Sequence, residues 1–234
     1  MENHIINFKG IKFYNYNFNK LFSIINKGGY LVAPAASALT DISTKKNYYN
    51  SLKESDIAIL DSGFFCILLR IFKGYKVSKL SGYLFLKNFI KKVKKNNKFL
   101  LIDPTSIDSK VNLLFLKSKN IKKIKSYTAP KYNNKKIKDT GLLKLIKKYK
   151  PRYIIINLGG GLQESLALYI KKNTKLKVSI LCTGAAIGFL TKRQAPINDT
   201  IDKFYLGWLA RTLYNPRRYF LRTIKSLGLV NQFI

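Results

Sequence analysis

Residues 153–172 read YIIINLGGGLQESLALYIKK, in which a short apolar run leads through a glycine-rich turn into a helical pattern. Four consecutive apolar residues bounded by a turn are typical of a strand that is buried on both faces. Similar apolar runs recur along the chain and alternate with stretches of helical periodicity. This alternation predicts an α/β fold, with a Rossmann-like, mostly parallel sheet and helices on both of its faces.

The expected elements can be placed from residue 4 to residue 182. A hairpin is expected within residues 4–16, with its turn at Gly10, because glycine suits a tight turn. The other expected strands cover residues 30–32, 57–60, 98–102, 121–127, 153–157 and 178–182. The expected helices cover residues 17–27, 43–54, 63–72, 84–95, 106–118, 138–149 and 162–172.

The alternation stops after about residue 195. Apolar side chains between Ile201 and Thr212 repeat at helical spacing, which predicts a helix with one apolar face. Asn198 or Asp199 can cap this helix.

A second helix is expected to begin at Asn215-Pro216, because asparagine caps helices and proline suits their first position. This helix has two neighbouring faces. One is basic and holds Arg218, Arg222 and Lys225; the other is apolar and holds Phe220, Ile224 and Leu227. Such a helix is typical of a membrane interface, although an ordinary helix that packs on the sheet shows a similar pattern. We therefore expect an α/β domain over residues 1–195 and a basic amphipathic helical appendage over residues 196–234.

Positive charge dominates the composition, with 44 Lys and Arg residues against 11 Asp and Glu residues and a formal net charge of +33. This charge favours anionic partners such as nucleic acid, anionic lipid or phosphorylated ligands, but a compositional bias toward lysine would produce the same excess. Arginine is more informative, because five of the seven arginines lie after residue 190. The guanidinium group matches phosphate oxygens, so this cluster predicts a phosphate or lipid head-group site; its members are Arg193, Arg211, Arg217, Arg218 and Arg222.

Several classes of site are excluded by the residues that are missing. His4 is the only histidine, which excludes a Ser-His-Asp triad and a histidine-based metal cluster on this chain. Cys66 and Cys182 lie far apart in apolar surroundings, so we expect buried free thiols in a reducing compartment. No Asp-x-Asp pair is present to hold a metal on a nucleotide-sugar diphosphate, so we expect no metal and no other cofactor.

The membrane relation of the chain is also constrained. No apolar run is long enough to cross a bilayer, and asparagine and charged residues interrupt the N-terminal stretch in which a signal peptide would stand. Any membrane role is therefore expected to be peripheral.

Four segments place glycines, small residues or polar residues directly after expected strands, at residues 33–37, 61–63, 159–164 and 183–186. Ligands bind at the carboxyl ends of the strands in open parallel sheets, where backbone N–H groups at helix N-termini can bind phosphate. Asp61 stands at one such end, where partial desolvation would raise the pKa of its carboxyl and suit a general base. Capping of the following helix is the alternative role for this carboxylate.

These segments and the C-terminal region resemble the motifs of one family, in the family's order. Asp61-Ser62-Gly63-Phe64 and Lys79-Leu80-Ser81-Gly82 resemble DGxG…RVxG, and the run from Tyr153 to Gly161-Leu162-Gln163-Glu164 resembles the GxPKQE segment. Residues 183–186 with 192–196 resemble GAAFDF…KRAP, and residues 207–211 with 215–218 resemble GLEWLYRL…EPRR. From about residue 5 to the C-terminus, the sequence is thus similar to the WecG/TagA/CpsF family, glycosyltransferase family 26.

The resemblance implies an inverting transferase that moves a sugar from a UDP-sugar to a sugar on a polyprenyl-diphosphate carrier. It implies a role in the assembly of a bacterial surface polysaccharide or teichoic acid, by a cytoplasmic protein on the inner face of the cell membrane. The expected partners are the donor, the lipid-linked acceptor and the anionic membrane surface, with no nucleic acid. A homo-oligomer is compatible with the sequence.

The resemblance also assigns roles to residues. Asp61 falls on the family's proposed base and Gln163 on a residue of its substrate pocket, so both are expected to be catalytic. Arg211, Arg217 and Arg218 are expected to close over the site and meet the lipid diphosphate. The other residues expected to bind substrate are Ser37, Lys79, Gly159, Gly160, Gly161, Glu164, Gly184 and Arg193.

Four positions depart from the family's pattern. Its TxN is Ala33-Pro34-Ala35 here, the Asp of GAAFDF is Gly188, the Arg of RVxG is Lys79, and the Asp that follows is Leu84. These losses leave open a changed donor or acceptor, or an inactive homologue, and Ser37 or Thr40 could replace the lost hydroxyl. The rival functions are a basic nucleic-acid-binding α/β protein and another α/β nucleotide enzyme, such as a methyltransferase.

Overall fold

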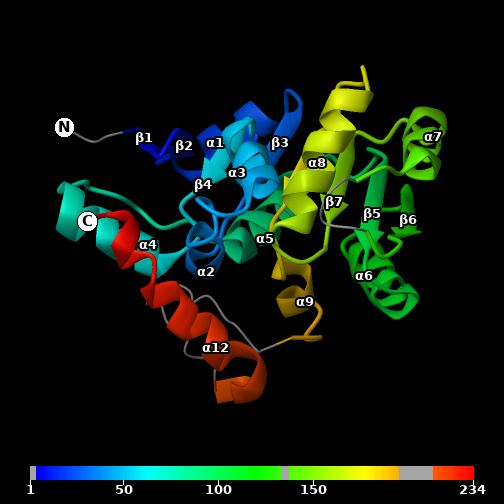
Figure 1. The fold of residues 1–234 in the computed structure, drawn as a ribbon. Coiled ribbons are helices and arrows are strands. Elements are labelled where there is room, and N and C mark those ends of the chain that lie inside the picture. The colour runs from blue at the N-terminus through cyan, green and yellow to red at the C-terminus, as the bar shows by residue number, and fades with distance from the viewer. Residues whose placement is uncertain (1–3, 133–136, 195–212) are drawn as a thin grey trace.

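The computed structural model describes residues 4–132, 137–194 and 213–234, whose strands form a single sheet (Figure 1). The sheet has eight strands in the order β1-β2-β4-β3-β8-β7-β5-β6. Their bounds are Ile5–Phe8 (β1), Ile11–Tyr14 (β2), Gly29–Val32 (β3), Ile57–Ile59 (β4), Phe99–Asp103 (β5), Ile124–Thr128 (β6), Tyr153–Ile156 (β7) and Ser179–Cys182 (β8). β1 and β2 pair antiparallel and every other neighbouring pair is parallel, which confirms the expected mostly parallel α/β sheet.

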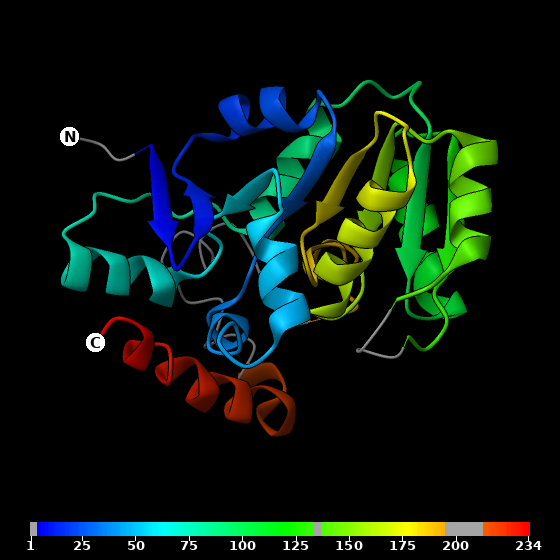
Figure 2. The same ribbon diagram turned by 45° about the horizontal axis from the view of Figure 1, so that its top comes forward.

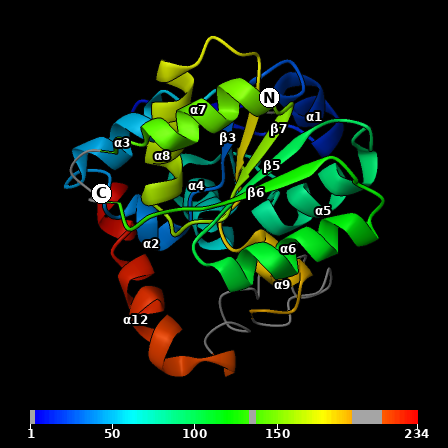
Figure 3. The same cartoon turned by 90° about the vertical axis from the view of Figure 1, so that its right-hand side faces the viewer.

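Helices cover both faces of this sheet (Figure 3). They are α1 (Phe18–Ile25), α2 (Ala36–Leu39), α3 (Lys46–Lys53), α4 (Gly63–Lys73), α5 (Gly82–Lys92), α6 (Ser106–Ser118), α7 (Thr140–Tyr149), α8 (Leu162–Asn173), α9 (Ala186–Leu190) and α12 (Pro216–Leu227), with a 3-10 turn η1 at Val230–Gln232. Side chains alternate along each strand, so Ile154 and Ile156 of β7 join the core beneath α3, α4, α7 and α8. Tyr153 and Ile155 join the core beneath α1, α5 and α6 instead.

The boundaries differ from the sequence-based expectation where the chain turns locally. The strand expected at residues 121–127 begins at Ile124, because Asn120 is left-handed (φ 63°) and the Ile121 N–H bonds back to the Leu116 carbonyl at 3.2 Å. The short helices α2 and α9 follow β3 and β8, where no helix was expected, since so few residues show no periodicity. The helix expected around residues 201–212 lies outside the described residues.

The C-terminal helix α12 begins at Pro216, as expected, and packs against α2, below the carboxyl ends of the strands (Figure 2). The Tyr219 hydroxyl donates to Gln194 Oε1 (3.4 Å), just after α9, and Lys225 Nζ lies 2.6 Å from Asp41 Oδ1, just after α2. Although burial by itself would raise the pKa of Asp41, hydrogen bonds from Lys225 and Lys45 hold that pKa below its usual value. The carboxyl edge is therefore covered in part by a helix that electrostatic contacts hold in place.

The end of the chain continues this contact. Phe233 packs against Phe8, Phe65 and Phe72, with ring centroids 4.9, 6.0 and 5.7 Å apart. No helix among the described residues is long and apolar enough to span a bilayer. The boundary expected at residue 195 lies outside the described residues, so the division into two parts stays a prediction.

Candidate active site

The four segments singled out in the sequence meet at one edge of the sheet. β4, β3, β8 and β7 are consecutive and parallel, so their carboxyl ends lie side by side. The turns after these strands hold Asp61, Ala33, Gly184 and the glycines Gly159–Gly161, in that spatial order. Open parallel sheets bind ligands at this edge, and it forms the candidate active site.

Asp61 is half-buried directly beyond β4. Its Oδ1 accepts a hydrogen bond from the backbone N–H of Gly82 at 2.7 Å. Because Gly82 is the first residue of α5, the Asp61 carboxylate lies at the positive end of that helix dipole, where negatively charged side chains are favourable. Ser62, and not Asp61, caps α4, since Ser62 Oγ accepts from the Phe65 N–H at 3.2 Å. The expectation that Asp61 caps the helix that follows it, α4, is therefore wrong; its carboxylate binds the first N–H of α5 instead.

Gly82 shows how closely the surrounding turns approach this carboxylate. A Cβ atom at Gly82 would lie 2.8 Å from the carbonyl oxygen of Thr183 and 3.1 Å from the Cβ of Ala33. The start of α5 thus touches the turns after both β8 and β3, and any larger residue at position 82 would clash with backbone. Asp61 is held beside both turns by this packing.

Gln163 joins two of the turns through both ends of its amide. Its Nε2 donates to Glu164 Oε1 at 2.8 Å, and its Oε1 accepts from the Gly184 N–H at 3.1 Å. The side chain is buried. Gln163 therefore lies in the wall of the candidate site, where it positions the turn after β8 relative to the start of α8, and its catalytic role stays a prediction.

Glu164 is buried beside Gln163 at the start of α8. Its Oε2 accepts from the Gly161 N–H at 2.6 Å. The positive φ of Gly161 (90°) orients this N–H, and such a backbone conformation favours glycine. Burial raises the pKa of Glu164 to about 7, against the opposing effect of the hydrogen bonds from Gln163 and Gly161. Glu164 thus organises the glycine turn rather than facing solvent.

The cations expected at the site occupy different positions. Lys79 is half-buried. Burial raises the pKa of the Cys66 thiol to about 12; the charge of Lys79 lowers this pKa, and the charge of Asp61 raises it. Arg193 is about half exposed and pairs with Asp108 in the first turn of α6, at 3.6 Å. Arg217 is exposed at the start of α12, whereas Arg211 and the side chain of Arg218 lie outside the described part of the chain.

Other expected residues have structural partners or open surroundings. Ser37 is buried in α2, and the Thr40 hydroxyl donates to the Ser37 carbonyl at 2.8 Å, as a local helix contact. Gly159 and Gly160 border open space, because a Cβ atom at either would meet nothing within 4 Å. A Cβ at Gly188 would lie 3.0 Å from Gln194, whose side chain occupies the space beside the position of the family's Asp.

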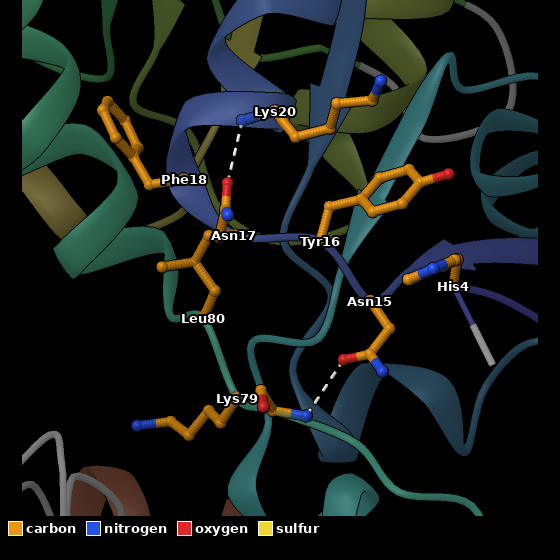
Figure 4. A pocket seen from close by; sticks show the side chains of 9 residues that line it. His4, Asn15, Tyr16, Asn17, Phe18, Lys20, Lys79 and Leu80 are labelled. Atoms are coloured by element: carbon orange, nitrogen blue, oxygen red, sulfur yellow. Dashed lines mark hydrogen bonds between the residues drawn. The ribbon is translucent and has the colours of Figure 1, made fainter. Parts of the chain in front are cut away.

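A hollow of about 590 Å³ adjoins this edge on the side of β2 (Figure 4). Tyr16 and Lys20 line it together with Leu80, and the ammonium of Lys79 points away from Tyr16 (Figure 4). Asn15 Oδ1 accepts from the Ser78 N–H at 3.0 Å and so links the two loops that line the hollow. Sequence reasoning found only Lys79 among these residues, because the hollow forms between two loops distant in the chain.

Three buried side-chain atoms among the described residues have no hydrogen-bond partner, namely Tyr48 Oη, Asn157 Oδ1 and Thr183 Oγ1. Asn157 and Thr183 directly follow β7 and β8, and Tyr48 lies against Gly161. Buried polar atoms are nearly always paired in folded proteins, so these three atoms at one edge of the sheet are candidates for contact with a ligand. Sequence reasoning missed Tyr48, because nothing in its local pattern relates α3 to the glycine turn.

Within residues 4–132, 137–194 and 213–234, no group of three or more His, Cys, Asp or Glu side chains could hold a metal ion. The expectation of metal independence stays a prediction.

The comparison of the whole chain with known families accords with this arrangement. The glycosyl transferase WecG/TagA/CpsF family matches residues 6–232 of the 234-residue chain. No match is found among curated proteins. Because the family match covers nearly the entire sequence, the chain belongs to the WecG/TagA/CpsF family of glycosyltransferases.

Proposed function

We propose that this glycosyltransferase moves a sugar, with inversion at the anomeric carbon, from a UDP-sugar to a sugar carried on polyprenyl diphosphate. The product would enter a bacterial surface polysaccharide or teichoic acid. The observation that carries the proposal is the position of Asp61, beside the turns after β3 and β8 and hydrogen-bonded to the start of α5. This position supports a base that faces a ligand bound at the carboxyl edge.

The proposed reaction is a single displacement. The acceptor hydroxyl oxygen attacks the anomeric carbon, Asp61 accepts the hydroxyl proton, and the bond from the anomeric carbon to the phosphate oxygen breaks. The electron pair of that bond leaves with UDP. Backbone N–H groups of the glycine turns and the side chain of Arg193 would stabilise the negative charge on the leaving diphosphate.

A transfer assay tests this proposal. We expect one member of a panel of UDP-hexoses and UDP-N-acetylhexosamines to release UDP when a synthetic lipid-diphosphate-linked sugar is supplied, with an inverted glycosidic bond in the product. Thermal-shift measurements with UDP-sugars and with S-adenosylmethionine provide an independent readout of the donor class. Stabilisation by S-adenosylmethionine alone, or no transfer from any donor in the panel, would refute the proposal.

A membrane-binding role for α12 is supported by its exposed surface. Phe220, Leu221, Ile224 and Leu227 are exposed large apolar residues, and Arg217 and Lys225 lie on the same helix. Apolar side chains beside cations suit the interface of an anionic bilayer, where each nearby cation contributes about 1 kcal/mol. The exposed side chains of Ile71 and Phe72 on α4 continue this surface through the contact between Phe72 and Phe233.

Vesicle co-sedimentation tests the membrane role. The double variant Leu221→Ser/Ile224→Ser should bind vesicles of phosphatidylglycerol and phosphatidylcholine at least about tenfold more weakly, because burial of a Leu or Ile side chain contributes roughly 1.5–3 kcal/mol. Ile107→Ser/Leu114→Ser is the matched control, because Ile107 and Leu114 are similarly exposed on α6. Equal losses in both variants, or tight salt-sensitive binding to duplex DNA with none to vesicles, would contradict this role for α12.

A further inference from the structure

Two buried hydroxyl groups stand unpaired at the carboxyl edge, on elements that are separate in the sequence. Tyr48 of α3 is 4% exposed and Thr183, directly after β8, is 5% exposed. Within the part of the chain that the structure describes, neither Tyr48 Oη nor Thr183 Oγ1 has a hydrogen-bond partner. A hydroxyl that loses water on folding without gaining a partner is destabilising, so a protein retains it where a ligand supplies the partner.

The fold pairs comparable hydroxyls elsewhere. Tyr30 is as deeply buried as Tyr48, yet its hydroxyl donates to the Ser51 carbonyl at 2.6 Å. Ser179 begins β8, the strand that Thr183 follows, and its hydroxyl donates to the Ile25 carbonyl at 2.6 Å. The unpaired hydroxyls thus lie at the carboxyl edge of the sheet, while the paired Ser179 lies at the opposite edge.

Both hydroxyl-bearing residues adjoin the parts of the candidate site already described. A Cβ atom at Gly161 would lie 3.9 Å from the Tyr48 ring. A Cβ atom at Gly82, whose N–H donates to Asp61, would lie 2.8 Å from the carbonyl oxygen of Thr183. Gln163 links the two regions through its contacts with Glu164 and Gly184. Tyr48 therefore lies beside the glycine turn, and Thr183 lies beside the start of α5 that binds Asp61.

The charges around Tyr48 select the kind of ligand. Besides burial, the carboxyl groups of Glu164, Asp41 and Asp61 raise the pKa of the Tyr48 hydroxyl well above its usual value. Sugar hydroxyl groups are neutral and can both donate and accept, so they can bind the Tyr48 hydroxyl beside these carboxyl groups. Thr183 also lies near Ala33, whose N–H donates at 3.1 Å to the carbonyl of Cys182, the residue before Thr183.

We propose that the hydroxyl groups of Tyr48 and Thr183 bind the hydroxyl groups of the sugar that is transferred. This inference rests on the proposed function, because it assumes a UDP-sugar donor. The glycine turn and Arg193 bind the diphosphate of the donor, and the two hydroxyls select and orient the sugar ring against Asp61.

The test compares Tyr48→Phe and Thr183→Val with Tyr30→Phe and Ser179→Ala. The first pair removes unpaired hydroxyls, so we expect an unchanged or higher melting temperature, an unchanged thermal shift with UDP alone, and a kcat/KM for the UDP-sugar lowered about 10- to 100-fold. The second pair removes paired hydroxyls, so we expect a lower melting temperature and an unchanged kcat/KM at temperatures below it.

The outcomes separate this inference from the proposed function. If the wild-type protein neither binds UDP nor uses any UDP-sugar, the proposed function fails and the inference fails with it. If the wild-type protein transfers sugar while Tyr48→Phe and Thr183→Val keep kcat/KM within twofold, the inference alone is wrong. An equal loss of affinity for UDP and for the UDP-sugar also overturns it, because the hydroxyls would then act on the nucleotide.

Discussion

Asp61→Asn should lower kcat by about 10²- to 10⁴-fold, the usual contribution of a positioned general base, while the protein remains folded. The amide oxygen of asparagine can still accept the Gly82 N–H, which lies 2.7 Å from Asp61 Oδ1. Asparagine cannot accept the proton of the acceptor hydroxyl, so the chemical step loses its base. The measurement is single-turnover transfer with the preferred UDP-sugar, together with the melting temperature.

The same strand supplies the control for this variant. Asp56 stands just before β4, at the opposite edge of the sheet from Asp61, and its carboxylate pairs with Lys171 at 2.9 Å. Asp56→Asn should leave kcat within about twofold, because an exposed ion pair contributes only about 0–1 kcal/mol to folding and lies away from the substrate. Near wild-type turnover by Asp61→Asn, measured with the true substrates, would remove Asp61 from the mechanism.

Stability should fall as pH rises from about 4.5 to about 7, because of Glu164. Burial raises the pKa of this carboxyl in the folded protein from 4.5 to about 7. In that window the unfolded chain has already released the proton that the folded chain still binds, so the free energy of unfolding decreases with pH. A single carboxyl with this pKa shift lowers the free energy of unfolding by as much as about 3 kcal/mol, and the full decrease is reached above pH 7.

Urea unfolding at pH 5, 6, 7 and 8 would measure this dependence in the wild type and in Glu164→Gln. The amide oxygen can accept from only one of the two donors that Glu164 binds, the Gly161 N–H and Gln163 Nε2, so we expect the variant to be less stable at pH 5. The deficit should narrow toward pH 8, where the wild type carries a buried charge. His4 is the only histidine, which leaves few other groups to titrate in this range.

Glu54→Gln is the matched control, because Glu54 is an exposed glutamate whose ion pair with Lys172 lies outside the candidate site. Its stability should follow that of the wild type at every pH. A constant difference between Glu164→Gln and the wild type from pH 5 to pH 8 would show that Glu164 does not titrate in this window.

The sequence went furthest where a local pattern carries the information. The strand at residues 153–156, the hairpin around Gly10 and the helix that begins at Pro216 were all expected, because each depends on neighbouring residues alone. The position of Asp61 at the carboxyl end of a strand followed from the same reasoning. The sequence indicated Gln163 as a site residue through its resemblance to a family motif. It did not indicate that the side-chain amide of Gln163 would bond to Glu164 and to Gly184 within the protein.

From the sequence alone, the alternation of apolar and amphipathic segments determined an α/β protein, and the order of its motifs indicated the glycosyltransferase family. The tertiary structure decided which turns meet, because β8 pairs between β3 and β7 although those strands are far apart in the chain. It also decided that Ser62 caps α4 in place of Asp61, that Lys225 holds α12 at Asp41, and that two buried hydroxyls stay unpaired. Strand order and side-chain pairing depend on contacts between distant segments, and no local periodicity encodes them.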